Sequence, residues 1–176
     1  MIPVLGEQEF RDLMAAVCAP VTIVTASVGE IPYGTTVSAF ASLSLKPPMV
    51  TVALDRRSGL LPHITASRRF GVNVLGQGQD DLALGFARRT PDRFAGVGWH
   101  FDHGLPRLEA APGWLACDLT DAVDGGDHLL LLGTVTHARS TPAAPLIYGY
   151  RTFGTHSHFA LRPRHPIGDH VAACAR

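Results

Sequence analysis

The 176-residue sequence predicts a mainly β protein with a few helices, folded as a closed antiparallel barrel. Three observations predict this class. Six or seven short strand-like runs are separated by turns rich in Gly and Pro, few segments have helical periodicity, and strands do not alternate with helices as in a βαβ sheet. The length suits a single domain, which we expect over residues 1–160, followed by a flexible polar tail over 161–176.

The first apolar pattern, over residues 7–18, predicts a helix that ends before Pro20. Its apolar residues recur at helical spacing: Phe10, Leu13, Met14 and Val17. A strand is expected over 21–26, followed by a turn over 29–32.

The central segment, residues 34–64, contains the densest group of small hydroxyl side chains in the chain: Thr35, Thr36, Ser38, Ser42 and Ser44. We expect a strand over 35–40, and the pair Pro47-Pro48 ends this run. A second strand is expected over 49–54, because apolar residues alternate there. One face carries Val50, Val52 and Leu54, and the other carries Thr51 and Ala53.

Two short helices are expected next. One spans 59–67, with Ser58 as N-cap and Pro62 in the first turn, where a missing N–H costs little. The other spans 79–89, with two Asp residues in its first turn and Arg88 and Arg89 in its last, complementing the helix dipole. A strand over 70–75 separates them.

The second half is expected to be almost entirely strand and loop. Over residues 90–112 we expect a long ordered loop that contains at most one short strand. Strands are expected over 114–123 and 129–137, and the unbroken apolar run 129–132 predicts a strand covered on both faces. The runs 146–150 and 152–159 add one more strand or a hairpin.

The composition of the chain argues against some classes of function. Formal net charge is zero, which argues against a general nucleic-acid binder. The three cysteines are far apart and form no CxxC pair, which fits a reducing, cytoplasmic location. No signal peptide and no apolar run of membrane-spanning length is recognised, so we expect no membrane association.

Several residues are candidates for ligand binding. The hydroxyls of 35–44 could hydrogen-bond the edge of a flat polar ring, or they could be solvated side chains of an edge strand. Arg56, Ser58 and a helix start at Gly59 could form a phosphate site, or simply a capped helix beside solvated arginines. Asn73 lies within an apolar strand and needs partners, either a ligand or a neighbouring turn.

A Gly-Gly hairpin turn precedes Asp127 and His128. An imidazole at the start of a strand could contact a substrate amide or guide proton transfer, although an ordinary turn would look the same. The histidines lack metal-ligand spacing and there is no HExxH, so we expect no metal site. GxGxxG, P-loop and GxSxG patterns are absent from the sequence as well.

Taken together, several segments resemble the short-chain flavin reductases, the reductase components of two-component flavin-dependent monooxygenases. The matching segments occur in the order of that family and cover about residues 8–154. They are GTTVSAFASLSLKPPMVTVALDRRS (34–58), RFGVNVLGQGQDDLALGFA (69–87), DRF with a later Gly and Trp (92–99), LP and LE (105–109), CDL with GGDHLLLLGTV (117–135) and PLIYGY (145–150).

The resemblance implies an FMN-binding split β-barrel of Greek-key type that forms a homodimer. It implies hydride transfer from NADH or NADPH to FMN or FAD, and delivery of the reduced flavin to a separate monooxygenase. The flavin-binding residues would be Thr35, Thr36, Val37, Ser38, Ser42, Leu43, Ser44, Asp55, Arg56, Ser58 and Asn73. The nicotinamide would contact Asp127, His128 and Tyr148, with His128 the catalytic candidate that orients it.

Two other functions stay open at this point. A split-barrel oxidase would retain its flavin and oxidise a small substrate, and a flavin- or haem-binding protein would have no enzymatic activity. The Gly-Asp-His turn favours the reductase, because a binding protein needs no contact to a nicotinamide. The residues do not distinguish FMN from FAD or NADH from NADPH.

Overall fold

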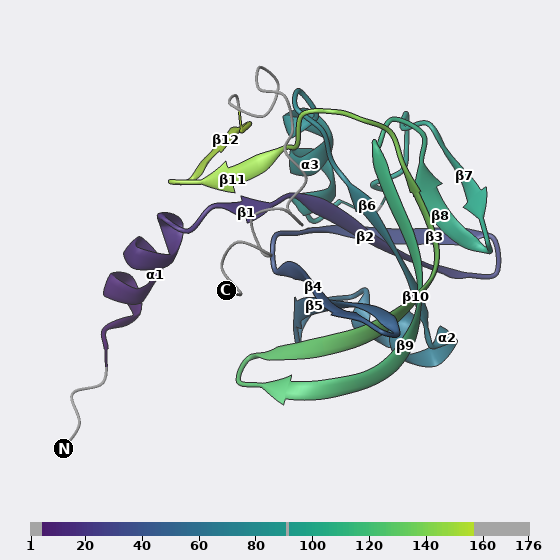
Figure 1. Cartoon of the computed structure of the whole chain (residues 1–176), viewed down its shortest axis with the longest axis horizontal. Helices are drawn as coiled ribbons and strands as arrows, with labels where there is room; N and C mark the ends of the chain where they lie inside the picture. The colour runs from purple at the N-terminus through teal and green to yellow at the C-terminus, as the bar shows by residue number, and fades with distance from the viewer. Residues whose placement is uncertain (1–4, 91, 157–176) are drawn as a thin grey trace, which may run out of the picture.

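The computed structural model describes residues 5–90 and 92–156, whose arrangement Figure 1 shows. Within these residues the helices are α1 (Glu7–Ala15), α2 (Leu61–Ser67) and α3 (Asp80–Ala87). The strands are β1 (Ala19–Pro20), β2 (Thr22–Val28), β3 (Ile31–Val37), β4 (Phe40–Leu45), β5 (Pro48–Asp55), β6 (Arg69–Val74), β7 (Trp99–Asp102), β8 (Leu105–Leu108), β9 (Gly113–Gly125), β10 (His128–Ser140), β11 (Ile147–Gly149) and β12 (Thr152–Gly154). The mainly β class predicted from the sequence is confirmed.

Seven of the strands form one antiparallel sheet with the order β3-β2-β6-β9-β10-β5-β4. Its outer strands, β3 and β4, are consecutive in the chain and joined only by Ser38 and Ala39. Three Cα–Cα steps span at most about 11 Å, so the two edges of the sheet must approach each other. The amide of Ala53 on β5 donates to the carbonyl of Ala39 at 2.9 Å, which continues the β4–β5 pairing up to this two-residue link.

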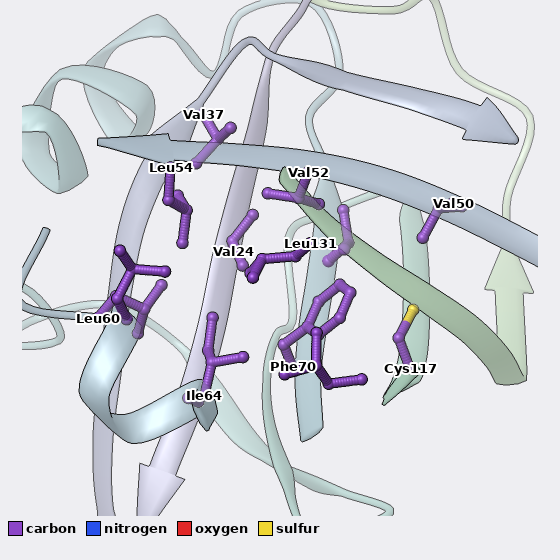
Figure 2. Close-up of a cluster of buried hydrophobic side chains, with 14 residues drawn as sticks. Val24, Val37, Val50, Val52, Leu54, Leu60, Ile64, Phe70, Cys117 and Leu131 are labelled. Carbon is purple, nitrogen blue, oxygen red and sulfur yellow. The ribbon is translucent and has the colours of Figure 1, made fainter. Parts of the chain in front are cut away.

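The barrel interior is filled by the apolar faces of its strands, as Figure 2 shows. Val50, Val52 and Leu54 point inward from β5, which confirms the alternation predicted there. Phe70 lies at the centre of this cluster. A Cβ on Gly133 of β10 would lie 2.4 Å from Cζ of Phe70, so only glycine allows β10 to cross over this ring.

A second apolar cluster lies between the barrel and α3, and it includes Ile23, Leu75, Phe86, Phe94 and Leu108. It lies beneath the hairpin β7–β8, which occupies the region expected to carry one short strand at most. The hairpin adds two strands there because Trp99, half-buried, packs against this cluster.

Several element boundaries differ from those expected. The strand expected over 35–40 is divided, because the chain turns at Ser38–Ala39 between the two edges of the sheet. The helix α2 begins at Leu61, and the hydroxyl of Ser58 accepts from the amide of Leu60 in the preceding turn instead of capping the helix. The helix α3 ends at Ala87, so Arg88 and Arg89 lie beyond it.

The run 129–132 is less covered than predicted. Only Leu131 is buried, and the other three leucines are half-buried, because the β9–β10 ribbon extends beyond the barrel with its outer face partly open. The expected tail over 161–176 lies outside the described residues, as does the end of the segment expected as a strand over 152–159. The single domain expected over 1–160 stays a prediction.

The helix α1 stands away from the barrel next to β1 and β11 (Figure 1). The helix itself is confirmed, but its apolar stripe is uncovered in the single chain. Phe10, Leu13 and Met14 are 52%, 60% and 41% exposed, and no residue of α1 is buried. The helix is held by its end, where the amide of Tyr150 donates to the carbonyl of Ala15.

Candidate functional site

A cleft of about 870 Å³ opens at one end of the barrel. Its walls come from β3, the end of β5, the start of α2, the segment after α3 and the first residue of β10. Seven of the residues predicted to bind flavin or nicotinamide line it: Thr35, Thr36, Val37, Ser38, Asp55, Ser58 and His128.

The wall formed by β3 and the residue after it carries one hydroxyl that is hydrogen-bonded within the described part of the chain and two that are not. Thr36 is already engaged, because its hydroxyl donates to the carbonyl of Ala83 on α3 at 2.5 Å and so ties β3 to that helix. The hydroxyls of Thr35 and Ser38 have no partner within residues 5–90 and 92–156. These two can therefore bond to a ligand without breaking an internal contact.

The end of β5 provides an ion pair. The carboxylate of Asp55 accepts from Nε and Nη2 of Arg57 at 3.1 and 2.8 Å, and from the Arg57 amide at 2.7 Å. These hydrogen bonds hold the pKa of Asp55 well below its usual value, so Asp55 is ionised at neutral pH. Ser58 closes the turn by donating its amide to the carbonyl of Asp55.

Two further arginines line the opposite wall, in the segment that follows α3. Arg93 donates through Nη1 to the carbonyl of Gly34 at 2.6 Å and through Nε to the carbonyl of Arg88 at 2.8 Å. Burial, followed by repulsion from Arg89, lowers the pKa of the Arg93 guanidinium from its ordinary value. Arg57, Arg89 and Arg93 therefore give the cleft three guanidinium groups.

An aromatic pair forms another part of the wall. The rings of Tyr33 on β3 and His63 on α2 stack with centroids 3.8 Å apart and an interplanar angle of 26°. Both residues line the cleft. The pair gives the cleft a planar surface against which a ring system could lie.

His128 enters the cleft from the start of β10. Its Nδ1 lies 2.7 Å from Oδ1 of Asp127, and this hydrogen bond lowers the pKa of the Asp127 carboxyl. In the antiparallel pairing of β10 with β5, His128 is opposite Asp55. The Gly-Asp-His turn therefore delivers an imidazole to the same cleft as the hydroxyls of β3.

The remaining predicted site residues lie outside the cleft. Ser42, Leu43 and Ser44 are on the edge strand β4, and Leu43 is 49% exposed. Arg56 turns away and bonds the hairpin tip between β9 and β10 instead, while its neighbour Arg57 lines the cleft. Asp127 meets His128 but is not part of the lining.

Asn73 is fully buried, and both ends of its amide are engaged. Its Nδ2 donates to the carbonyl of Ile23 on β2 at 3.2 Å, and its Oδ1 accepts from the amide of Leu108 on β8 at 2.8 Å. Of the two interpretations left open by the sequence, this geometry matches a brace between neighbouring segments.

Tyr148 lines a different hollow of about 490 Å³ between α1 and β11. Ser38 lines both this hollow and the cleft, so the two adjoin. Its other side is formed by Phe10 and Met14 on the exposed apolar face of α1 and by Val17 just after the helix, which ends at Ala15, before the expected residue 18.

Sequence reasoning missed Tyr33, His63, Arg57, Arg89 and Arg93. From the sequence, Arg89 is expected at the end of a helix, and Arg93 is part of the matching segment DRF only. A signal was present in the density of arginines after α3, where Arg88, Arg89 and Arg93 fall within six residues. His63 and Tyr33 are 30 residues apart in sequence, and nothing local indicates that their rings meet.

Within the described residues, no group of three or more His, Cys, Asp or Glu side chains is placed to hold a metal ion. No helix in this part of the chain combines the length and apolarity needed to cross a membrane. The cleft thus provides free hydroxyls, three guanidiniums, the carboxylates of Asp55 and Asp92, and the imidazoles of His63 and His128. Such a set suits an anionic ligand that carries a flat polar ring.

Comparison with known proteins identifies a family profile described as flavin reductase like domain, which matches residues 14–157. A similar protein is the reductase component of 4-nitrophenol 4-monooxygenase/4-nitrocatechol 2-monooxygenase from Rhodococcus opacus. It is 39% identical over 150 residues, which cover 85% of this chain and 81% of that protein.

Two further proteins extend the comparison. NADH:riboflavin 5′-phosphate oxidoreductase from Streptomyces pristinaespiralis is 38% identical over 154 residues, which cover 85% of this chain and 87% of that protein. The crystal structure of nitrilotriacetate monooxygenase component B from Mycobacterium thermoresistibile superposes with a TM-score of 0.85 at 31% identity. The match covers 90% of this chain and 91% of that one.

Proposed function

The chain belongs to the family of flavin reductase-like domains, and on this premise we propose that it is the reductase of a two-component monooxygenase system. It is an NAD(P)H:flavin oxidoreductase, which uses a nicotinamide cofactor to reduce FMN or FAD. The reduced flavin then leaves for a separate monooxygenase. A cytoplasmic location is part of the proposal, based on the three scattered cysteines.

One observation carries the assignment of the site. The free hydroxyls of Thr35 and Ser38, the guanidiniums of Arg57 and Arg93, and the imidazole of His128 line the same cleft. A flavin nucleotide needs hydrogen bonds along one edge of its ring and positive charge at its phosphate. The residues present fit both requirements.

We assign the ring edge to β3 and the phosphate end to the arginines. Thr35 and Ser38 would hydrogen-bond the ring, and Thr36 and Val37 would shape the strand that carries them. Ser58 and Arg57 would meet the phosphate, with Asp55 holding the Arg57 guanidinium in place. Arg89 and Arg93 would add positive charge from the opposite wall.

When bound, the two cofactors supply the chemistry, a hydride transfer from the nicotinamide to the flavin ring. The protein contributes binding and orientation. His128 would contact the nicotinamide amide, and Asp127 would orient the imidazole through its Nδ1. No side chain needs to act as an obligatory acid or base.

A homodimer of split-barrel type is the second part of the proposal. Its support is the uncovered apolar surface of the single chain, which includes Leu13 on α1 and Leu45 on β4, at 60% and 82% exposed. Several large apolar side chains left exposed on a single chain are typical of an interface between chains. The hollow between α1 and Tyr148 adjoins the cleft at Ser38, so a second chain there would lie near the bound ligand.

A competing function is an oxidase that keeps its flavin tightly bound. The imidazole of His128 in the cleft favours the reductase, because an oxidase that keeps its flavin needs no contact to a nicotinamide. The colour of the purified protein separates these functions. A tightly bound flavin gives a yellow protein, and a haem-binding protein would be red. A reductase that uses flavin as a substrate is pale.

The experiment that tests the proposal follows the loss of absorbance at 340 nm with purified protein. NADH and NADPH are each offered with FMN, FAD, riboflavin or no flavin. Turnover that depends on added flavin is the expected result, and it also identifies the preferred pair. Binding of flavin without oxidation of either nicotinamide contradicts the proposal.

A further inference from the structure

We propose that Arg56 is a positioning residue that fixes the hairpin turn carrying His128 and thereby sets the angle at which the imidazole enters the cleft. The inference rests on the proposed function, because it concerns the residue that would contact the nicotinamide. In this role Arg56 does not bind the phosphate but acts through His128.

Three hydrogen bonds connect Arg56 to the turn between β9 and β10. Its Nη2 donates to Oδ1 of Asp124 at 2.5 Å, its Nε donates to the carbonyl of Gly126 at 2.9 Å, and its amide donates to the carbonyl of Asp127 at 3.0 Å. The contacts fall on three of the four residues that precede His128. The guanidinium therefore connects the end of β9 to the tip of the turn, and the backbone amide adds the contact to Asp127.

The turn has little other support. Asp124 and Asp127 are 82% and 89% exposed, and Gly126 adopts a positive φ of 68°. Among the described residues, Arg56 is the only one outside β9, β10 and the turn itself whose side chain hydrogen-bonds residues 124–127. Without its side chain, the tip of the hairpin depends on backbone contacts: the β9–β10 ladder, the pairing of His128 with Asp55, and the bond from the amide of residue 56 to the carbonyl of Asp127.

Loosening the turn would act directly on His128. Asp127, which holds Nδ1 of the imidazole, is also the residue whose carbonyl accepts from the amide of Arg56. A change in the backbone at Asp127 therefore moves both the imidazole and its hydrogen-bond partner. Small displacements of a group that orients a reactant can cost large factors in rate.

The same geometry argues against a phosphate contact. Arg56 has two of its side-chain nitrogens bonded to the turn, and the residue is not part of the cleft lining. Arg57 does line the cleft. The planar guanidinium holds Nε and Nη2 at fixed positions for the Gly126 carbonyl and the Asp124 carboxylate, so lysine at position 56 would restore the charge but not this geometry.

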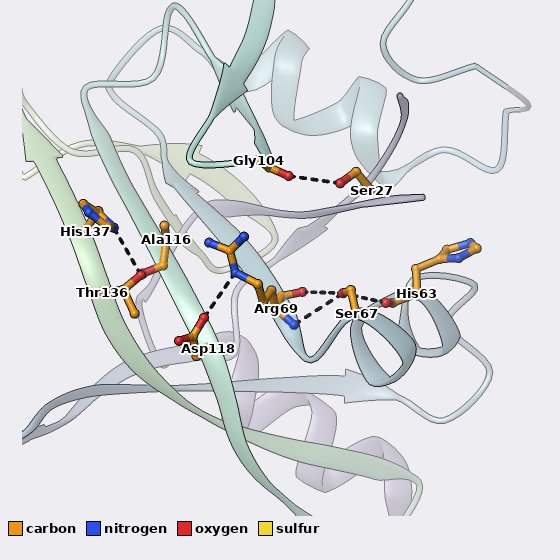
Figure 3. Close-up of polar contacts among 9 residues, drawn as sticks. All are labelled: Ser27, His63, Ser67, Arg69, Gly104, Ala116, Asp118, Thr136 and His137. Atoms are coloured by element: carbon orange, nitrogen blue, oxygen red, sulfur yellow. Dashed lines mark hydrogen bonds and ion pairs between the residues drawn. The ribbon is translucent and has the colours of Figure 1, made fainter. Parts of the chain in front are cut away.

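The chain offers a matched control in Arg69 and Asp118. Figure 3 shows Arg69 on β6 reaching across to Asp118 on β9, with Nε and Oδ1 3.2 Å apart. This pair also lies on the surface, with side chains 38% and 56% exposed against 45% and 82% for Arg56 and Asp124, and like Arg56 and Asp124 it lies outside the cleft lining. Exposed pairs of this kind contribute little to stability, so neither substitution should unfold the protein.

The test compares Arg56→Ala, Arg56→Lys, Asp124→Ala and Arg69→Ala with the wild-type protein. The Michaelis constants for NADH, FMN and riboflavin are measured, together with amide hydrogen exchange in peptides that cover residues 124–128. Riboflavin lacks the phosphate, so the ratio of the FMN and riboflavin constants reports any phosphate contact.

We expect Arg56→Ala to raise the Michaelis constant for NADH roughly tenfold while the FMN to riboflavin ratio stays unchanged. Arg56→Lys should restore only part of this loss, and Asp124→Ala should reproduce part of it. Exchange at 124–128 should become faster in Arg56→Ala, whereas Arg69→Ala should match the wild type in every measurement.

Two results would overturn the assignment. A loss of FMN affinity without loss of riboflavin affinity in Arg56→Ala would identify a phosphate ligand, and unchanged exchange at 124–128 would show that Arg56 does not fix the turn. If wild-type protein oxidises no nicotinamide with any flavin, the proposed function fails, and the exchange measurement still decides whether Arg56 holds the turn.

Discussion

His128 and Asp55 lie opposite each other in the antiparallel pairing of β10 and β5, the first residue of one strand facing the last residue of the other. The pairing brings together two loops whose paired residues, His128 and Asp55, are 73 positions apart in the sequence. One loop provides the arginine and serine of the proposed phosphate end, and the other provides the imidazole. The ladder between two strands thus sets the distance between the proposed flavin and nicotinamide sites.

The carboxyl of Asp55 depends on Arg57 for its ionisation at low pH. Its pKa is depressed in the folded protein, so its contribution to stability is present above the unfolded value of about 3.9 and is lost as the pH falls. Arg57→Ala should bring the pKa of Asp55 back toward its ordinary value. The part of the unfolding free energy that is lost at low pH because of Asp55 should then become smaller.

A carbon-detected NMR titration of the Asp55 carboxyl in wild type and Arg57→Ala measures the change. Arg69→Ala serves as the control, because it removes an arginine without touching Asp55. A titration curve for Asp55 that is the same in all three proteins would show that Arg57 is not the cause.

Asn73 is predicted to stabilise the fold without binding flavin. Asn73→Ala leaves the amide of Leu108 and the carbonyl of Ile23 buried without their partner, which should cost about 1–3 kcal/mol of unfolding free energy. Denaturant unfolding measures the loss, and the Michaelis constant for FMN should not change. A raised constant with normal stability would instead support the ligand interpretation.

Cys117 is predicted to be unreactive in the native protein. Burial, reinforced by Asp118, raises the pKa of its thiol to about 12, so almost no thiolate forms at pH 8. Iodoacetamide labelling followed by peptide mass spectrometry should find Cys117 modified only after denaturation. Cys18 is exposed and should be labelled in both states; labelling of native Cys117 at the same rate would contradict its burial.

Two glycines should respond to alanine in opposite directions. A Cβ on Gly71 of β6 would lie 2.3 Å from Cη2 of Trp114, so Gly71→Ala should destabilise the protein by about 1–3 kcal/mol. A Cβ on Gly85 of α3 meets nothing within 4 Å, and Gly85→Ala should stabilise the helix by about 0.5–1 kcal/mol. Thermal unfolding of both variants tests the packing around Trp114. Equal shifts of the melting temperature in the two variants would contradict this packing.

The sequence was informative where a local pattern determines structure. The alternation of Val50, Val52 and Leu54 fixed the inward face of β5, because side chains on a strand point to opposite faces with a period of two. The break between β3 and β4 was missed, since Ser38 and Ala39 carry no turn signal and the chain bends there only because the sheet closes.

Side-chain direction beyond the end of a strand could not be predicted. Arg56 and Arg57 follow β5 directly, but their side chains point in different directions. Arg57 enters the cleft, whereas Arg56 bonds the hairpin tip, about 70 positions away in the sequence. The apolar stripe of α1 was recognised from spacing, but spacing identifies an apolar face without saying what covers it. The partners of Asn73 were equally remote, because Leu108 is on a hairpin that the sequence did not indicate.

We propose that the nicotinamide binds at His128 while the flavin lies along β3. The steady-state rate of NADH oxidation by wild type and His128→Ala, with NADH and FMN varied independently, tests this placement. We expect a raised Michaelis constant for NADH and an unchanged constant for FMN in the variant. A loss of FMN affinity with normal dependence on NADH would contradict it.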